Sequence, residues 1–255
     1  MTLKESIFKE EAEFPKLLAD YEERKYGLLF YMEHNKDSYD GNHAFIYPEN
    51  ITNLGAVLDE ITEFYINKGI TPSIYHPHVE NYFSDNQLVF EAHDYTVTHE
   101  AAHRVMLLSA ENQIKTEKRL DVKVLTEWDE RIACDILIPS SEPWEIEPIK
   151  GMIEHKGSYI FVGYLNDEAV VYTNIHVSKK GNTRFDYIVT SKAHREKGYA
   201  SELLSFVVEY CKSNGFPVCW QWAGPSEHIC YRAGFREAFN IPAGYANYKR
   251  KGKMR

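Results

Sequence analysis

Apolar residues recur along the chain at two spacings, one typical of helices and one typical of strands. Spacings of three and four residues predict an amphipathic helix over residues 53–67, which Gly69 would end. The same pattern is stronger over residues 199–213, where a second helix would end at Gly215. Shorter helical patterns cover residues 5–25 (one or two surface helices), the stretches around 129–138 and 143–156, and residues 226–233 with Ser226 as N-cap.

Short runs of β-branched and aromatic residues between these helices predict strands. The predicted strands are residues 28–33, 43–47, 70–75, 104–108, 122–125, 158–165, 169–177, 184–190, 218–222, 236–239 and 245–249. In the first half a strand–helix–strand order indicates a parallel pair, and in the second half antiparallel hairpins precede a β-α-β unit. The predicted fold class is therefore α/β with a mixed (α+β) sheet.

The domain organisation follows from length and charge. A chain of 255 residues has room for two domains, and its clearest boundary is a polar stretch over residues 109–121. The first 120 residues carry 11 basic and 21 acidic side chains (net −10), and the rest carry 18 and 17 (net +1). We predict an N-terminal domain over residues 1–118 and a C-terminal domain over residues 119–255.

Composition excludes several classes of protein. The net charge of −9 is unsuited to a general nucleic-acid binder, which needs positive charge to displace counterions from phosphate. No apolar run approaches the roughly 20 residues of a membrane helix, and the first residues lack the apolar core of a signal peptide. The four cysteines show no C-x-x-C spacing, which favours a reducing cytoplasm.

The segment most informative about chemistry runs from a predicted strand, through a loop, into the helix at residues 199–213. Backbone N–H groups at a helix start have no partner in the helix and carry the positive end of its dipole, so they bind phosphate groups. Gly198 allows a ligand to approach the backbone, Ala200 stays small, and Arg195 and Lys197 add positive charge.

Arg195-Glu196-Lys197-Gly198-Tyr199-Ala200 resembles the acetyl-CoA loop of the GNAT (N-acetyltransferase) superfamily, [Q/R]-x-x-G-x-[G/A]. Tyr231 to Phe235 resembles the family's Y-x-x-x-G-F ending, and the order of elements over roughly residues 120–250 also matches. The resemblance implies a catalytic C-terminal domain that transfers the acetyl group of acetyl-CoA to an amine by direct attack in a ternary complex.

The resemblance also implies roles for individual residues. The backbone near Ile188, Val189 and Thr190 would pair with the pantetheine arm, and an amide near Val189 or Thr190 would stabilise the oxyanion. The loop amides and the Ser201 hydroxyl would hold the pyrophosphate. The predicted cosubstrate-binding residues are Ile188, Val189, Thr190, Arg195, Glu196, Lys197, Gly198, Tyr199, Ala200 and Ser201.

The general acid is where the sequence departs from the family. The family's frequent Tyr lies four residues before the Gly of G-F, and Cys230 occupies that position here. Tyr231 is one residue further on, a rotation of about 100° on a helix. Either Tyr231 faces the thiol of CoA, or Cys230 fills the position and another group is the acid. Candidate bases are Glu147, Glu154, Asp186 and Glu237.

A competing motif lies in the first half. His99-Glu100-Ala101-Ala102-His103 is an H-E-x-x-H pattern, which on a helix would bind zinc and make the protein a hydrolase. Its neighbours are β-formers and no third ligand follows, so we expect no metal. The element order of the first half resembles a degenerate GNAT half, because no G-x-G/A precedes its helix.

We therefore predict a cytoplasmic N-acetyltransferase whose cosubstrate is acetyl-CoA and whose acceptor is an amine on a small molecule or peptide. Neither nucleic acid nor a membrane is an expected partner. The alternatives are the zinc hydrolase and a non-catalytic CoA-binding sensor, which the absence of Tyr at position 230 leaves open.

Overall fold

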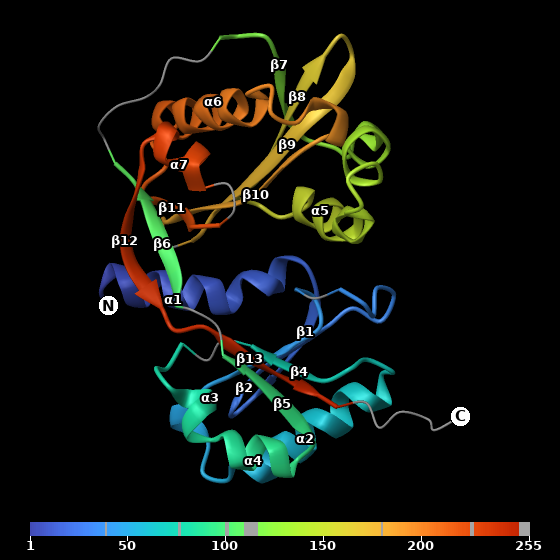
Figure 1. Ribbon diagram of the computed structural model, residues 1–255, viewed down its shortest axis with the longest axis vertical. Coiled ribbons are helices and arrows are strands. Elements are labelled where there is room, and N and C mark those ends of the chain that lie inside the picture. The colour runs from blue at the N-terminus through green and yellow to red at the C-terminus, as the bar shows by residue number, and fades with distance from the viewer. Residues whose placement is uncertain are drawn as a thin grey trace. The chain divides into compact units, whose positions relative to one another are not determined.

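In the computed structural model the chain divides into two compact units, each discontinuous in sequence (Figure 1). Unit 1 comprises Met1–Ile7 and Arg104–Asn240, and unit 2 comprises Phe8–His103 and the segment from Ile241 onward. The structure describes residues 1–38, 40–75, 78–99, 102–109, 117–179, 181–224 and 227–249. In this described part, none of the helices has both the length and the apolar character that a membrane crossing requires.

The helical elements are α1 (Leu3–Glu13), η1 (Phe14–Leu17), η2 (Pro48–Asn50), α2 (Leu54–Asn67), α3 (Tyr82–Asp85), α4 (Gln87–Ala92), η3 (Ile132–Leu137), η4 (Pro143–Glu145), α5 (Ile146–Ile153), η5 (Lys192–His194), α6 (Tyr199–Ser213) and α7 (Glu227–Ala233). The strands are β1 (Asp20–Arg24), β2 (Gly27–Tyr31), β3 (Ala44–Ile46), β4 (Ser73–Tyr75), β5 (Tyr95–His99), β6 (His103–Leu108), β7 (Asp121–Leu125), β8 (Ser158–Leu165), β9 (Glu168–Val177), β10 (Thr183–Thr190), β11 (Cys219–Trp222), β12 (Phe235–Ile241) and β13 (Gly244–Tyr248).

The sheet of unit 1 has the strand order β12-β6-β11-β10-β9-β8-β7. Strands β7 to β10 are successive antiparallel neighbours, and β10 is parallel to β11 across the α6 crossover. Asn166 and Asp167 join β8 to β9 with φ of +50° and +67°, the left-handed conformation that a type I′ hairpin turn requires. The predicted mixed sheet is confirmed.

The two faces of this sheet carry separate apolar cores. One core packs the sheet against α6 and α7, and the other packs it against η3 and α5. Successive residues of a strand point to opposite faces. On β10, Ile188 accordingly packs in the core with α6, and Val189 packs in the core with α5.

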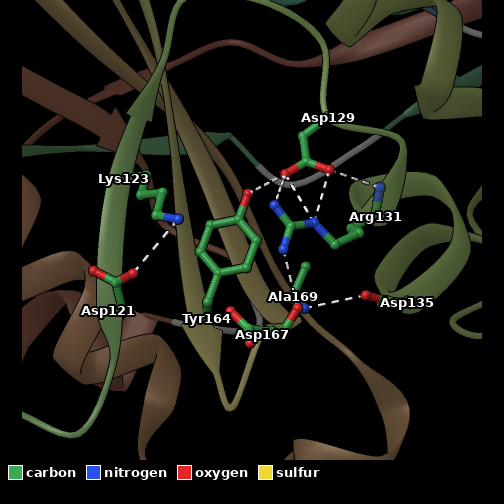
Figure 2. Close-up of polar contacts among 8 residues, drawn as sticks. All are labelled: Asp121, Lys123, Asp129, Arg131, Asp135, Tyr164, Asp167 and Ala169. Atoms are coloured by element: carbon green, nitrogen blue, oxygen red, sulfur yellow. Dashed lines mark hydrogen bonds and ion pairs between the residues drawn. The ribbon is translucent and has the colours of Figure 1, made fainter.

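A polar cluster fastens the segment before η3 to the β8–β9 hairpin (Figure 2). The carboxylate of Asp129 accepts hydrogen bonds from Arg131 (Nη2 at 2.7 Å) and from the hydroxyl of Tyr164 on β8 (2.5 Å). Arg131 also donates to the carbonyl of Asp167 in the hairpin turn at 3.1 Å. These bonds lower the pKa of Asp129 to about 2, chiefly because Arg131 binds its charged form.

The sheet of unit 2 has the order β1-β2-β3-β4-β13-β5. Strands β3 and β4 are parallel across the α2 crossover, which confirms the predicted parallel pair. Helix α2 buries Leu58, Ile61 and Tyr65 in a core with the sheet, as its periodicity predicts. Residues 20–24, predicted as part of a surface helix, instead form β1, because they pair with β2 in a hairpin.

Each sheet contains a strand from the other half of the sequence. β6 lies between β12 and β11 in unit 1, and β13 lies between β4 and β5 in unit 2 (Figure 1). Residues 245–249, predicted to close the C-terminal sheet, thus belong to the other sheet. The compact units therefore differ from the continuous division between residues 118 and 119 that the polar stretch predicts.

Candidate functional site

The loop between β10 and α6 presents an open helix start. Gly198 is the N-cap residue of α6 with φ of +85°, and in the described part of the chain no side chain caps this end. A left-handed conformation favours glycine, and Glu196 adopts it too with φ of +62°. The first amides of α6 are therefore available to an anion.

In unit 2, the start of the equivalent crossover helix, α2, is capped by a side chain. The side chain of Asn53 accepts a hydrogen bond from the amide of Ala56 at 3.2 Å and so caps the start of α2. The two crossover helices thus differ in whether a ligand can reach their first turn.

Beside the open helix start, β10 separates from its parallel neighbour. The two strands pair at Thr183 with Cys219 and at Arg184 with Trp220, and no further pair follows along these described strands. A β-bulge interrupts the pairing of β10 with β9 between Phe185 and Ile188. The last part of β10 therefore offers one edge to an extended ligand.

Exposed cations surround the loop. Arg195 donates from Nε to the carbonyl of Thr190 at 3.2 Å, and Lys197 donates to the carbonyl of Ala193 at 2.9 Å. Arg119, which the sequence did not single out, donates from Nη2 to the carbonyl of Lys197 at 3.0 Å. Three cationic side chains thus lie around the open amides.

Arg119 is held in place by Glu202, a buried residue in the first turn of α6. The Glu202 carboxylate accepts from the amides of Arg119 (2.5 Å) and Leu120 (2.6 Å) and from Arg119 Nε (3.2 Å). No local pattern could have revealed this contact, because the partners lie more than 80 residues apart.

Comparison with known proteins identifies the region that contains this loop. Residues 125–235 match the family model described as acetyltransferase (GNAT) family. This region is a GNAT domain. The family and its fold support acyl transfer, typically from an acyl-CoA. No curated protein matches the chain in sequence.

Solved structures share the fold over more of the chain. A GCN5-related N-acetyltransferase from Kribbella flavida is 12% identical with a TM-score of 0.63, covering 100% of this chain and 98% of its own. A conserved protein of unknown function from Staphylococcus epidermidis is 11% identical with a TM-score of 0.59, covering 90% and 93%. A tandem GNAT protein from the clavulanic acid biosynthesis pathway is 12% identical with a TM-score of 0.53, covering 82% and 74%. The predicted resemblance is confirmed, and the tandem protein is consistent with a second GNAT-like half.

The structure brings most of the predicted cosubstrate-binding residues of the GNAT domain together. Thr190, Arg195 and Gly198 lie at one end of β10 and its loop, and Tyr199 is buried as the first residue of α6. Val189 is also buried, so its backbone rather than its side chain is what a ligand on the strand edge could contact. The binding roles themselves remain predictions.

The two candidates for the general acid lie in different environments on α7. Cys230 is buried in the core with α6, and burial raises the pKa of its thiol to about 11. The hydroxyl of Tyr231 donates to the carboxylate of Glu237 on β12, and this bond raises the pKa of Tyr231. Glu237 also forms an ion pair with Arg104 of β6. Both candidates therefore hold their protons at neutral pH.

Among the candidate bases, only Asp186 lies on β10. Asp186 is half-buried at the bulge, where it pairs with Arg184 at 2.7 Å and accepts from Asn174 at 3.1 Å. Glu147 and Glu154 are exposed on or just after α5, and Glu147 faces Lys150 at 3.4 Å. Glu237 lies on β12, where it accepts from Tyr231 and pairs with Arg104. The four candidate bases are therefore dispersed over the domain.

A buried pair that the sequence did not indicate lies on the strand next to β10. Tyr172 of β9 is the register partner of Val189, and its hydroxyl donates to the buried carboxylate of Glu145 in η4. Burial raises the pKa of Tyr172 well above its ordinary value. The sequence carries no signal for this pair, because Glu145 is one of three acidic residues between positions 142 and 147.

The H-E-x-x-H pattern is not helical at its ends. His99 is the last residue of β5 and His103 is the first of β6, while Glu100 and Ala101 lie outside the described residues. The two imidazoles therefore do not share the helix face that the zinc hydrolase requires. Across the described ranges, no three His, Cys, Asp or Glu side chains are grouped so that they could hold a metal ion.

Proposed function

We propose that this protein is an N-acetyltransferase that transfers the acetyl group of acetyl-CoA to a primary amine on a small molecule or peptide. One observation carries the proposal. The uncapped start of α6, where Gly198 has a left-handed conformation, comes just after the part of β10 that is no longer paired with β11. An anion-binding helix start beside a free strand edge fits a ligand that joins a pyrophosphate to an extended amide-containing arm.

In this proposal the amides of residues 196–200 and the Ser201 hydroxyl bind the pyrophosphate, assisted by Arg195 and Lys197. The arm pairs with the backbone of Ile188 to Thr190. The acetyl carbonyl lies against the amide of Val189 or Thr190, which stabilises the negative charge that develops on its oxygen.

The reaction is a direct transfer. The amine nitrogen attacks the thioester carbonyl carbon, and the tetrahedral adduct collapses as the carbon–sulfur bond breaks. The amine loses a proton to a base such as Asp186, and the leaving thiolate gains one from Tyr231 or from Cys230. The products are an N-acetyl amide and CoA.

The two halves of the chain have separate roles in this proposal. We propose that residues 119–255 carry the chemistry and that residues 1–118 form a degenerate half without a cosubstrate loop, in keeping with the Asn53 cap on α2. The four cysteines are free thiols, which supports a reducing cytoplasm.

The decisive experiment measures acetyl-CoA binding by calorimetry and then CoA release across a panel of amines. Gly198→Asp should weaken binding at least about a hundredfold, because a carboxylate would meet the phosphates and the open amides. Gly215→Asp is the matched control, since Gly215 has a similar φ of +65° at the other end of α6. Unchanged affinity in Gly198→Asp would refute the proposed site, and binding without release would favour the CoA sensor.

A further inference from the structure

Two cysteines of the GNAT domain lie on either side of the turn that joins α6 to β11. Cys211 is in the last turn of α6, and Cys219 is the first residue of β11. Within this turn Gly215 has a left-handed φ of +65°, and the amide of Phe216 donates to the carbonyl of Cys211 at 2.9 Å. The chain therefore reverses just after the helix and brings β11 back beside it.

The reversal places the two thiols in contact. The Cys211 thiol donates a hydrogen bond to the sulfur of Cys219. The Cys219 thiol in turn lies 4.0 Å from the carbonyl oxygen of Phe216. Both side chains belong to the core that packs the sheet against α6 and α7. Two side chains that already point at each other can be joined by a bond without a rearrangement of the fold.

The surroundings make the two thiols chemically unequal. The hydrogen bond from Cys211 lowers the pKa of Cys219 and outweighs the opposing effect of burial. The Thr183 hydroxyl and the positive charge of Lys212 lower this pKa further. The pKa of Cys211 is raised, first by the hydrogen bond with Cys219 and then by burial. Because the thiolate is the reactive form, Cys219 is the nucleophile of the pair.

Access from solvent also differs between the two thiols. Cys211 is fully buried, whereas Cys219 is 6% exposed. Val218, the residue before Cys219, is 40% exposed and has a φ of +33°, a strained conformation for a β-branched residue. The route of a small reagent to the pair therefore passes this turn and meets Cys219 first.

We infer that Cys211 and Cys219 form a redox-active dithiol, a modification site that a peroxide converts into an intramolecular disulfide. The Cys219 thiolate attacks one oxygen of hydrogen peroxide, the oxygen–oxygen bond breaks, and a sulfenic acid and one water result. The Cys211 sulfur then attacks the Cys219 sulfur, the sulfur–oxygen bond breaks, and a second water leaves with the Cys211 proton. Two thiols are oxidised as one peroxide is reduced to two waters. This inference does not depend on the proposed function.

The test treats the folded full-length protein with hydrogen peroxide and counts its thiols. The titratable thiols should fall from four to two, and the mass should fall by about 2 Da, the two hydrogens lost. Peptide mapping should find the 211–219 disulfide, and dithiothreitol should restore both thiols. The oxidised protein should also melt at a higher temperature, because the bond restricts the unfolded chain. A lower melting temperature would show that the bond forms only in a distorted fold, against the inference.

Three variants assign the roles. Cys211→Ser should be labelled at Cys219 by dimedone, which traps sulfenic acids, because the second thiol that resolves the sulfenic acid is missing. Cys219→Ser should leave Cys211 unmodified. Cys134→Ser is the matched control and should still form the disulfide, since Cys134 is exposed on η3 at the other face of the sheet.

Two results would overturn the inference. The first is a peroxide-treated parent protein in which Cys211 and Cys219 both remain reduced. The second is a disulfide that joins Cys134 to another cysteine in place of the 211–219 bond. Both are read from the peptide map of the parent protein, so the test holds even where a serine variant fails to fold.

Discussion

At the scale of single residues, neighbours in sequence have different chemistry in α7. Cys230 faces the core, and Tyr231 reaches Glu237 on the adjoining strand. A helix rotates by about 100° per residue, so two adjacent residues cannot both face the same ligand. In the proposed mechanism, the identity of the acid thus depends on which side of α7 would face the thiol of CoA.

Substitution of the two residues separates these possibilities. We expect Tyr231→Phe to lower kcat about 10- to 100-fold with little change in KM, because the hydroxyl would act only when the thiolate leaves. Cys230→Ala should retain most of kcat, since its buried thiol packs in the core. Steady-state kinetics with a responsive amine would check both variants. The reverse pattern would assign the acid to Cys230.

At the scale of elements, one partly buried carboxylate holds a helical segment to the sheet. Asp129 connects the segment before η3 to β8 through Tyr164 and to the hairpin turn through Arg131 (Figure 2). The predicted helical stretch around residues 129–138 is thereby joined to a hairpin whose residues begin about 30 positions later. This linkage is electrostatic and so depends on pH.

We expect Asp129→Asn to lower the free energy of unfolding at pH 7 by about 1–2 kcal/mol, after allowance for solvent screening. The folded pKa of about 2 lies below the ordinary value of 3.8. The stabilisation is therefore complete above about pH 5 and is lost as the pH falls toward 2. Urea unfolding at pH 7 and pH 3 should show the difference between variant and parent shrinking at the lower pH. A constant difference would show that the charge of Asp129 is not what stabilises the contact.

At the scale of the whole molecule, the exchanged strands make each sheet depend on both halves of the sequence. β6 lies inside the sheet of unit 1, between β12 and β11, rather than at its edge. Without β6, both neighbours would expose unpaired backbone groups. A C-terminal domain beginning at residue 119 would lack this strand.

We therefore expect a fragment of residues 119–255 to aggregate or unfold without a cooperative transition. A fragment of residues 103–241, which contains every strand of the unit 1 sheet, is the control and should unfold cooperatively. Chemical denaturation followed by circular dichroism would compare them. Cooperative unfolding of the fragment 119–255 would show that its sheet is stable without β6.

Local structure could be predicted well from the sequence alone. The expected helix over residues 199–213 coincides with α6, and the expected helix over 53–67 differs from α2 only in that Asn53 is its cap. Periodicity and capping act within one or two turns, so they need no information from distant residues. The open start of α6 at Gly198 belongs to the same class of local feature.

The sequence by itself determined helices α2 and α6, the loop at Gly198 and the family resemblance, because each depends on residues close together in the chain. Only the tertiary structure decided which strands share a sheet. A strand's polarity pattern records that one face is buried, but it does not record which partner covers its edges. The same reason hid Glu202 and Glu145, which make their contacts across the fold.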